Sequence, residues 1–457
     1  MTTLGSLIAA GLVAPKSAPE TVADPYTGIE FNLGYRITHY DLDLTYRVEP
    51  NLLSGEAKLQ VVADGDIDKL SVDLAGAMAA RRISASGAKV SRFRQAGGKL
   101  RITLANKVKA GEKFTLTIRY GGNPRPLRTP WGEIGWEETN SGALVASQPN
   151  GAPSWFPCDD NPCEKATYDL KITADNPFTV ISNGKLLGSK ASGSTTSWHY
   201  QHKQPMATYL ASIEVGEFTE VRLGPSTRAW VPAHLVARAK EEFSQQQQML
   251  ELFSALFGPY PFTEYQVVVV DEDLEIPLEA QGISIFGRNH LTADHRYERL
   301  VAHELAHQWF GNAVGLSRWQ DIWLNEGFAC YCEWIWADHA GKTPVHESAR
   351  SHYAVLGRKA EDLLLSNPGT KLMFDDRVYK RGALTVHALR RLLGDELFFT
   401  AVKDFLSTYL HSTATADDFF TSLDNTIESA GKLFAWDGIC EIRAQWLENK
   451  ELPKFPA

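Results

Sequence analysis

The sequence predicts an α+β protein of two domains, an all-β N-terminal domain followed by a mostly helical C-terminal domain. Strand patterns dominate the first half of the chain, helical patterns dominate after about residue 295, and 457 residues correspond to about two or three domains. Hydrophobic residues make up 44% and charged residues 22%, which is enough apolar material for a sizeable core. The predicted parts are an irregular leader over residues 1–34, the all-β domain over 35–220 and the helical domain over 221–457.

Alternating patterns identify the strands of the first domain. Leu42, Leu44 and Tyr46 alternate with polar residues in HYDLDLTY, which is the period of a half-buried strand. Residues 99–104 and 113–120 repeat this pattern, and Gly-Gly and Asn-Gly turn signals separate such runs. These runs predict an all-β portion that extends to about residue 220.

The second part of the chain changes to helical spacing. A run of four valines in EYQVVVVDED predicts one buried strand, and the Gly and Pro residues of FGPYPF end the helix before it. Apolar residues recur with the spacing of one helix face in most of the remaining chain. Helices are predicted within residues 239–258, 297–311, 325–341, 381–394 and 401–412.

Charge and cysteine usage exclude several classes of protein. The net charge is −9 and the chain has no long run of Lys and Arg, so nucleic acid is not expected as a partner. No membrane association is expected, because no stretch of about 18 apolar residues is present. The first basic residue is Lys16, after the N-terminal apolar run, so a signal peptide is not expected. Five scattered cysteines predict free thiols and a cytoplasmic location.

The stretch RLVAHELAHQWFGN contains the strongest chemical signal. His303 and His307 stand four residues apart, so a helix places both imidazoles on one face. Zn²⁺ accepts neutral nitrogen ligands in a tetrahedral site, and a catalytic zinc keeps its fourth position for water. Glu304 is beside the first histidine, where its carboxylate can take a proton from that water. The alternative is an amphipathic helix that carries the pattern by chance. A random chain of this composition is expected to contain only about 0.02 H-E-x-x-H matches.

A third ligand is expected in WLNEGFACY. Glu326 follows His307 with 18 residues between them, at the start of the next helical pattern. A glutamate there can also serve only the helix dipole, but the spacing favours a role as metal ligand. Asp321 is a weaker candidate for a carboxylate that orients a ligand imidazole.

The run HELAHQWFGN, followed by WQDIWLNEGFACYCEW, resembles the aminopeptidase N family of zinc metallopeptidases, the gluzincins. Residues 155–170, 204–218 and 257–271 resemble further segments of that family, in the family's order. The resemblance covers roughly residues 35–450. It implies a saddle-like β-domain, a thermolysin-like catalytic domain, one Zn²⁺ per chain and hydrolysis of the N-terminal residue from peptides.

The same resemblance implies a site for the substrate's free amine. An exopeptidase needs a carboxylate or amide that holds an ammonium group close to the metal. The family's G-x-M-E-N loop corresponds to IPLEAQG, which keeps Glu279 but places Pro277, without an N–H, before it. Gln148 corresponds to the second amine contact and is neutral here. Both residues can alternatively be surface or turn residues, and the motif order favours the binding role.

The family's oxyanion donor is a tyrosine in a Y-x-K-G run, which corresponds here to Tyr379 in YKRG. Its hydroxyl is expected to stabilise the negative oxygen of the tetrahedral intermediate. His387, on the same predicted helix, is expected to pack rather than bind metal. Structural roles are also expected for the acids Asp159, Asp160 and Glu164 and for the tryptophans Trp309, Trp319, Trp323, Trp334 and Trp336.

Three alternatives to an aminopeptidase remain open. A zinc endopeptidase is compatible with the altered amine loop, and one branch of the family hydrolyses epoxides or esters with the same metal site. A non-catalytic scaffold would not need the complete set of ligands, Glu304 and Tyr379. The sequence stops at WLENKELPKFPA, which implies a short form without the C-terminal helical domain of longer relatives, and therefore a more open cleft.

Overall fold

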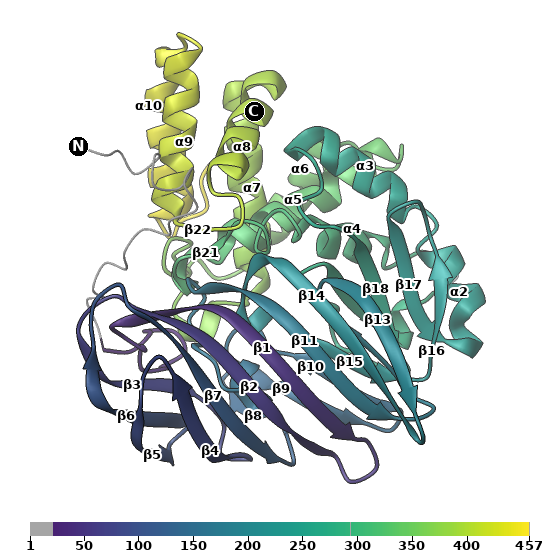
Figure 1. Ribbon diagram of the computed structural model, residues 1–457. Coiled ribbons are helices and arrows are strands. Elements are labelled where there is room, and N and C mark those ends of the chain that lie inside the picture. Colours follow the sequence, from purple (N-terminus) through teal and green to yellow (C-terminus); the bar gives the residue numbers. More distant parts are fainter. Residues whose placement is uncertain (1–21, 293, 457) are drawn as a thin grey trace. The chain divides into compact units, whose positions relative to one another are not determined.

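The computed structural model describes residues 22–292 and 294–456, which divide into two compact units (Figure 1). One, here called the strand unit, comprises residues 22–240 and 262–291. The other, here called the helical unit, comprises residues 241–261, 292 and 294–456. The α+β organisation with strands early and helices late is therefore confirmed. Residues 1–21 of the predicted leader lie outside the described residues.

The units divide the chain differently from the predicted boundary at residue 220. Strand β17 (Thr227–Pro232) pairs in parallel with β18 (Tyr265–Val270), although two helices separate them in the chain. A parallel pair needs such a crossover connection. Strands β17 to β20 are therefore part of the strand unit, although they follow residue 220.

The largest sheet of the strand unit has seven strands in the order β13-β14-β11-β1-β2-β7-β4 (Figure 1). β1 runs parallel to β11 and antiparallel to β2. Tyr40, Leu42, Leu44 and Tyr46 of β1 are buried, which confirms the predicted alternation. The strands are β1 (Tyr35–Arg47), β2 (Leu52–Ala63), β4 (Met78–Ser86), β7 (Lys113–Gly122), β11 (Lys165–Asp175), β13 (Lys185–Ser192) and β14 (Thr195–Ala207).

Three smaller sheets complete the strand unit, in the orders β3-β6-β5, β12-β15-β10-β9-β8 and β16-β17-β18-β20-β19. β18 is buried along its whole length, as its run of valines predicts. An apolar cluster that includes Leu144, Ile181, Val268 and Ile285 joins the last two sheets. The remaining strands are β3 (Ile67–Asp73), β5 (Val90–Ala96), β6 (Lys99–Val108), β8 (Leu127–Thr129), β9 (Gly132–Thr139), β10 (Gly142–Ala146), β12 (Thr179–Ser182), β15 (Ile213–Gly216), β16 (Phe218–Arg222), β19 (Leu278–Ala280) and β20 (Ile283–Gly287).

Helices α3 to α10 lie in the helical unit, together with the short pair β21 (Gly315–Leu316) and β22 (Thr413–Ala414). The single helix predicted over residues 239–258 is interrupted by a turn in which Gln246 N donates to Phe243 O. No described helix is long and apolar enough to cross a membrane. The helices are α2 (Val236–Glu242), α3 (Gln246–Phe257), α4 (Glu298–Ala306), α5 (Trp323–His339), α6 (Val345–Leu356), α7 (Asp376–Leu393), α8 (Asp395–Thr408), α9 (Ala416–Ser429) and α10 (Trp436–Ile442).

Candidate active site

The two histidines of the H-E-x-x-H run lie one turn apart at the end of α4. His303 belongs to the helix, and His307 caps it with helical backbone angles and donates its N–H to His303 O. Glu326 lies in the first turn of α5 and is buried, as both histidines are. The structure therefore brings the three predicted ligands together inside the helical unit.

The side chains of these residues converge on one point. His303 Nε2 and His307 Nε2 each lie 3.4 Å from Glu326 Oε2. A tetrahedral zinc with ligand distances of about 2.1 Å holds neighbouring ligand atoms about 3.4 Å apart. The donor set and its spacing therefore fit Zn²⁺.

The other nitrogen of each imidazole has a partner that faces away from this point. His303 Nδ1 lies 2.8 Å from Glu333 Oε1, and His307 Nδ1 lies 3.0 Å from Phe310 O. A carboxylate and a carbonyl only accept hydrogen bonds, so each Nδ1 is the donor. In the neutral rings the lone pair is consequently on Nε2, which is the arrangement that zinc-binding histidines use.

Charges at the site favour a bound cation. Burial alone would raise the pKa of Glu333, but Lys380 and His303 outweigh burial and lower it to about 2. The imidazoles of His307 and His303 likewise outweigh burial and lower the pKa of Glu326. Burial alone would lower the pKa of His303, yet its bonds to Glu326 and Glu333 raise it to about 9. Ionised carboxylates in a buried site attract positive charge.

The helix α7 approaches α5 closely at two glycines and brings Tyr379 to the site. A Cβ on Gly327 would lie 2.7 Å from the backbone of Gly382, so neither position has room for a side chain. The Tyr379 ring stacks on the His303 ring with centroids 6.0 Å apart and an interplanar angle of 18°. This close crossing explains why glycines follow both Glu326 and the YKR run.

Comparison with known proteins decides the family. The Peptidase M1 N-terminal domain matches residues 37–210, and the Peptidase family M1 domain matches residues 241–446. The chain belongs to the peptidase M1 family. The family resemblance that the sequence motifs indicate is thereby confirmed.

Relatives of this M1 chain carry aminopeptidase names. Probable aminopeptidase 2 of Sulfurisphaera tokodaii is 29% identical over 326 residues, covering 66% of this chain and 40% of the relative. Leucyl aminopeptidase of Saccharolobus solfataricus is 27% identical, covering 66% of this chain and 40% of that protein. This chain spans about 40% of the length of these relatives. The M1 zinc metallopeptidase structure from Deinococcus radiodurans has a TM-score of 0.83 at 28% identity, covering 96% of this chain and 100% of its own.

Glu333 is a site residue of this M1 chain that sequence reasoning missed. Asp321, the carboxylate proposed for orienting a ligand ring, bonds Arg318 Nε at 2.7 Å instead. Glu333 holds His303, and it lies seven residues after Glu326, two turns along the same face of α5. That spacing is the signal that could have identified it.

A basic side chain supports Glu333 from α7. Lys380 Nζ donates to Cys330 Sγ at 3.2 Å, and its charge acts on Glu333. Burial raises the pKa of the Cys330 thiol to about 12, so this sulfur is a neutral neighbour and not a thiolate ligand. All five cysteines are free, as predicted.

The predicted amine-binding residues lie together in the strand unit. Gln148 follows β10, and Glu279 is the middle residue of β19, where it pairs with Ser284 of β20. Gln148 Nε2 donates to Glu279 Oε1 at 2.5 Å. Glu279 is buried. The fold thus brings the two predicted side chains into direct contact, although 131 residues separate them in the sequence.

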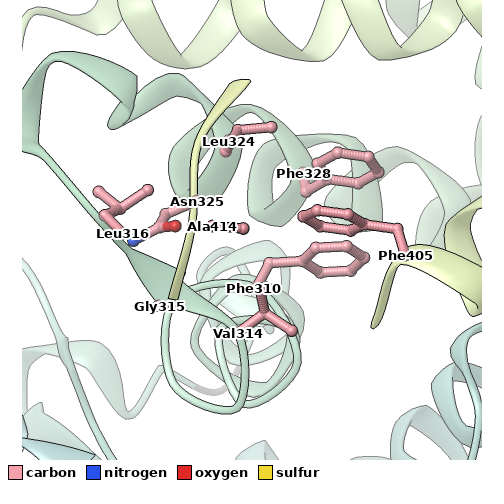
Figure 2. Close-up of a pocket in the computed structure, with 9 residues that line it drawn as sticks. All are labelled: Phe310, Val314, Gly315, Leu316, Leu324, Asn325, Phe328, Phe405 and Ala414. Carbon is pink, nitrogen blue, oxygen red and sulfur yellow. The ribbon is translucent and has the colours of Figure 1, made fainter. Parts of the chain in front are cut away.

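A small apolar pocket in the helical unit is lined in part by Leu324, Asn325 and Phe328 of α5, the helix that carries Glu326 (Figure 2). Its volume is about 10 Å³, which is enough for about one water molecule and for no substrate. Phe310 and Phe328 stack on one side with centroids 4.2 Å apart, and Asn325 lies on the other (Figure 2). This packing supports the backbone on either side of Glu326.

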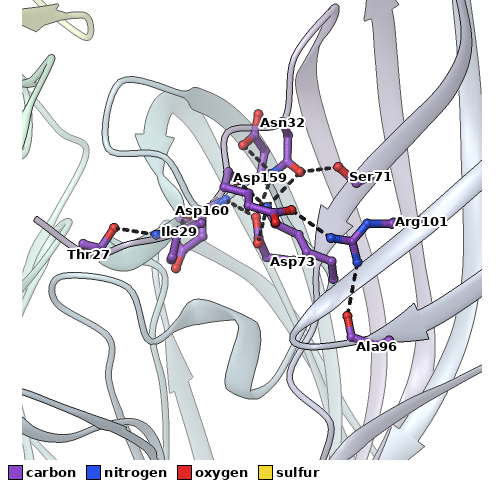
Figure 3. A network of polar contacts seen from close by, with 12 residues as sticks. Thr27, Ile29, Asn32, Ser71, Asp73, Ala96, Arg101, Asp159 and Asp160 are labelled. Carbon is purple, nitrogen blue, oxygen red and sulfur yellow. Dashed lines mark hydrogen bonds and ion pairs between the residues drawn. The ribbon is translucent and has the colours of Figure 1, made fainter. Parts of the chain in front are cut away.

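The acidic pair Asp159 and Asp160 has the structural role expected from the sequence (Figure 3). Asp159 accepts from Asn32 Nδ2 at 2.9 Å, and Asp160 accepts from Thr208 Oγ1 at 2.6 Å. The same network contains the buried ion pair of Lys99 and Asp73 at 2.7 Å. The tryptophans Trp309, Trp319, Trp323, Trp334 and Trp336 are buried as predicted.

Proposed function

We propose that this chain is a zinc-dependent aminopeptidase that hydrolyses the N-terminal residue from peptides. The observation that carries the proposal is the buried ligand set in which both Nε2 atoms lie 3.4 Å from Glu326 and both Nδ1 atoms are held by acceptors. Aminopeptidase names among the relatives support it, and one similar structure from Deinococcus radiodurans holds a Tyr-Ser-Ala substrate.

In this proposal one Zn²⁺ per chain is held by His303, His307 and Glu326. When bound, zinc supplies Lewis-acid chemistry: it polarises the scissile carbonyl and makes water a stronger nucleophile at neutral pH. Glu304 accepts the proton of the attacking water and passes it to the leaving amine. The Tyr379 hydroxyl donates to the oxyanion of the tetrahedral intermediate.

Glu279 and Gln148 bind the substrate's α-ammonium in this proposal. The Gln148 amide donates a hydrogen bond to one carboxylate oxygen of Glu279. A second carboxylate at position 148 would instead repel Glu279. The pair therefore offers one negative charge to a singly charged ammonium. The hydrogen bond from that ammonium to the Glu279 carboxylate is charge-assisted.

The domain boundaries and location are further parts of the proposal. We assign an all-β N-terminal domain to residues 35–220 and a thermolysin-like zinc catalytic domain, which contains Glu279, to residues 221–457, after a leader at 1–34. Peptides with a free N-terminus are the proposed partners, with no nucleic acid and no membrane, as the net charge of −9 favours. Five free cysteines favour a cytoplasmic location.

Aminoacyl anilides, free and N-acetylated, test this function. Cleavage of the free set alone, lost with a chelator and restored by zinc, is the expected result. Equal cleavage of the acetylated set would replace the aminopeptidase with a zinc endopeptidase. Cleavage of epoxides or esters but of no anilide would establish a non-peptide hydrolase, and no hydrolysis at all would favour a scaffold.

A further inference from the structure

Arg381 comes two residues after Tyr379 in α7 and is buried. Its guanidinium binds a segment that lies about 65 to 70 residues later in the sequence. That segment, residues 445–455, is here called the C-terminal strap. All five contacts are hydrogen bonds to main-chain carbonyls. Nε donates to Trp446 O at 2.8 Å, Nη1 to Lys450 O at 2.8 Å, and Nη2 to Gln445 O at 3.2 Å, Glu451 O at 3.0 Å and Asn449 O.

The chemistry of this contact requires arginine. A guanidinium carries five N–H donors in a fixed planar fork, whereas a lysine ammonium has three donors at one point. The carboxylate charge that acts on this guanidinium, that of Glu361, does not outweigh the effect of burial on its pKa. Burial lowers the pKa of Arg381 to about 10, so the side chain stays charged at neutral pH. Carbonyl dipoles of the strap therefore replace the water that the charge loses.

The strap is itself fixed to the helical unit at other points. Tyr353 of α6 donates its hydroxyl to Pro453 O at 2.8 Å. Ser366 N donates to Leu447 O at 3.0 Å. The guanidinium of Arg350 lies 5.3 Å from the centroid of the Phe455 ring. Arg381 thus holds a segment that cannot simply follow the movement of its own helix.

The first turns of α7 are consequently held on two sides. Residues two apart on a helix point about 200° away from each other, so Tyr379 and Arg381 lie on opposite faces. The Tyr379 ring stacks on His303, while Arg381 faces the strap. Gly382 touches Gly327 of α5 without room for a Cβ. A shift of α7 towards or away from α5 would break the Arg381 contacts.

We propose that Arg381 is a positioning residue for Tyr379. It ties the start of α7 to the C-terminal strap and so holds the Tyr379 hydroxyl at the distance from His303 that oxyanion stabilisation requires. The role of Tyr379 rests on the proposed function. The mechanical part, that the strap holds the start of α7 through Arg381, does not depend on any activity.

The test combines kinetics with a double-mutant cycle. R381K keeps the charge and loses most of the fork, so kcat is expected to fall about tenfold with KM within about twofold, part of the 10²–10³ that an oxyanion donor contributes. N449A loosens the turn that Asn449 Oδ1 forms with Glu451 N, without altering α7, and kcat is expected to fall about threefold. In a Y379F background both changes should have almost no further effect.

A matched control separates positioning from stability. Y353F removes the hydrogen bond from the Tyr353 hydroxyl to Pro453 O but leaves Arg381 intact, so it should lower thermal stability and leave kcat within about twofold. Bound zinc, measured in every variant, should stay at one per chain. A tenfold loss in R381K that persists in the Y379F background, or an equal loss in Y353F, would overturn the proposal.

Hydrogen exchange decides the mechanical part independently. In zinc-loaded R381K, amide protection should fall in residues 445–451 and also in 376–382. Loss of protection in the strap alone would overturn the proposal even if the wild-type chain hydrolysed no peptide. Loss in both segments with an inactive wild-type chain would instead refute only the proposed function.

Discussion

Glu326 and Glu333 in the helical unit and Glu214 in the strand unit are all buried, yet the first two are ionised at neutral pH and Glu214 is mostly protonated. Histidine and lysine neighbours lower the pKa of the first two, to about 2 for Glu333. Glu214 accepts hydrogen bonds from the Ser212 hydroxyl and the Val145 backbone, and burial raises its pKa to about 8. The comparison shows that a buried acid stays ionised where cationic groups surround it and takes up a proton where they are lacking.

Glu304 gives the largest expected effect, because it is the buried acid of the helical unit that we propose as the general base. E304Q keeps the shape of the side chain but cannot accept a proton, so kcat should fall by about 10²–10⁴-fold. Anilide hydrolysis measures it, with bound zinc as the control. A variant that keeps a tenth of the wild-type kcat would remove Glu304 from the mechanism.

Glu333 tests whether an ionised acid behind a ligand strengthens metal binding. E333Q should weaken zinc binding by about 10–100-fold, since the amide no longer carries the charge that faces His303. Competition with a chromophoric chelator measures the Kd. D321N is the matched control and should bind zinc as the wild type does, because Asp321 bonds Arg318. The reverse result would restore Asp321 as the orienting residue.

A variant at Glu279 tests whether a buried acid of the strand unit also acts through its charge. E279Q should raise KM for free aminoacyl anilides by about 10-fold or more, the value of a charge-assisted hydrogen bond. E275Q makes the same charge change at an exposed position of the same segment and should leave KM unchanged. Equal KM in both variants would mean that Glu279 binds no ammonium.

Glu214 gives the smallest effect, on stability and only at alkaline pH. Its folded pKa of about 8 exceeds the ordinary 4.5, so the folded state binds the extra proton between these values. Its contribution to stability is full below pH 4.5 and is lost as pH rises through about 8. E214Q should therefore raise Tm at pH 9 by roughly 5 °C and leave it unchanged at pH 4. Calorimetry that finds the same gain at both pH values would contradict the raised pKa.

The convergence of the three proposed metal ligands could be predicted because helix geometry places residues of suitable spacing side by side. His303 and His307 lie one turn apart, and 18 residues are enough for α5 to return Glu326 to them. Glu333 obeys the same rule, two turns further along α5, although the zinc motif itself does not include it. Strands in which buried and exposed residues alternate, such as β1, could also be predicted from the sequence.

Other features had no sequence signal. Arg381 binds main-chain carbonyls, which every residue carries, so nothing in the sequence marks residues 445–451 as its partner. The unit boundary depends on the parallel pairing of β17 with β18, which two helices separate in the chain. The local sequence pattern of a strand does not show which strand it pairs with. Glu214 lies in a short strand buried on both faces, where alternation gives no information.

X-ray absorption at the zinc edge of the purified, zinc-loaded chain tests the central claim most directly. The account predicts one zinc per chain with two imidazole nitrogens at about 2.0–2.1 Å and carboxylate oxygen at about 2.0–2.2 Å. Sulfur at about 2.3 Å, or a single imidazole, would contradict a site made by His303, His307 and Glu326.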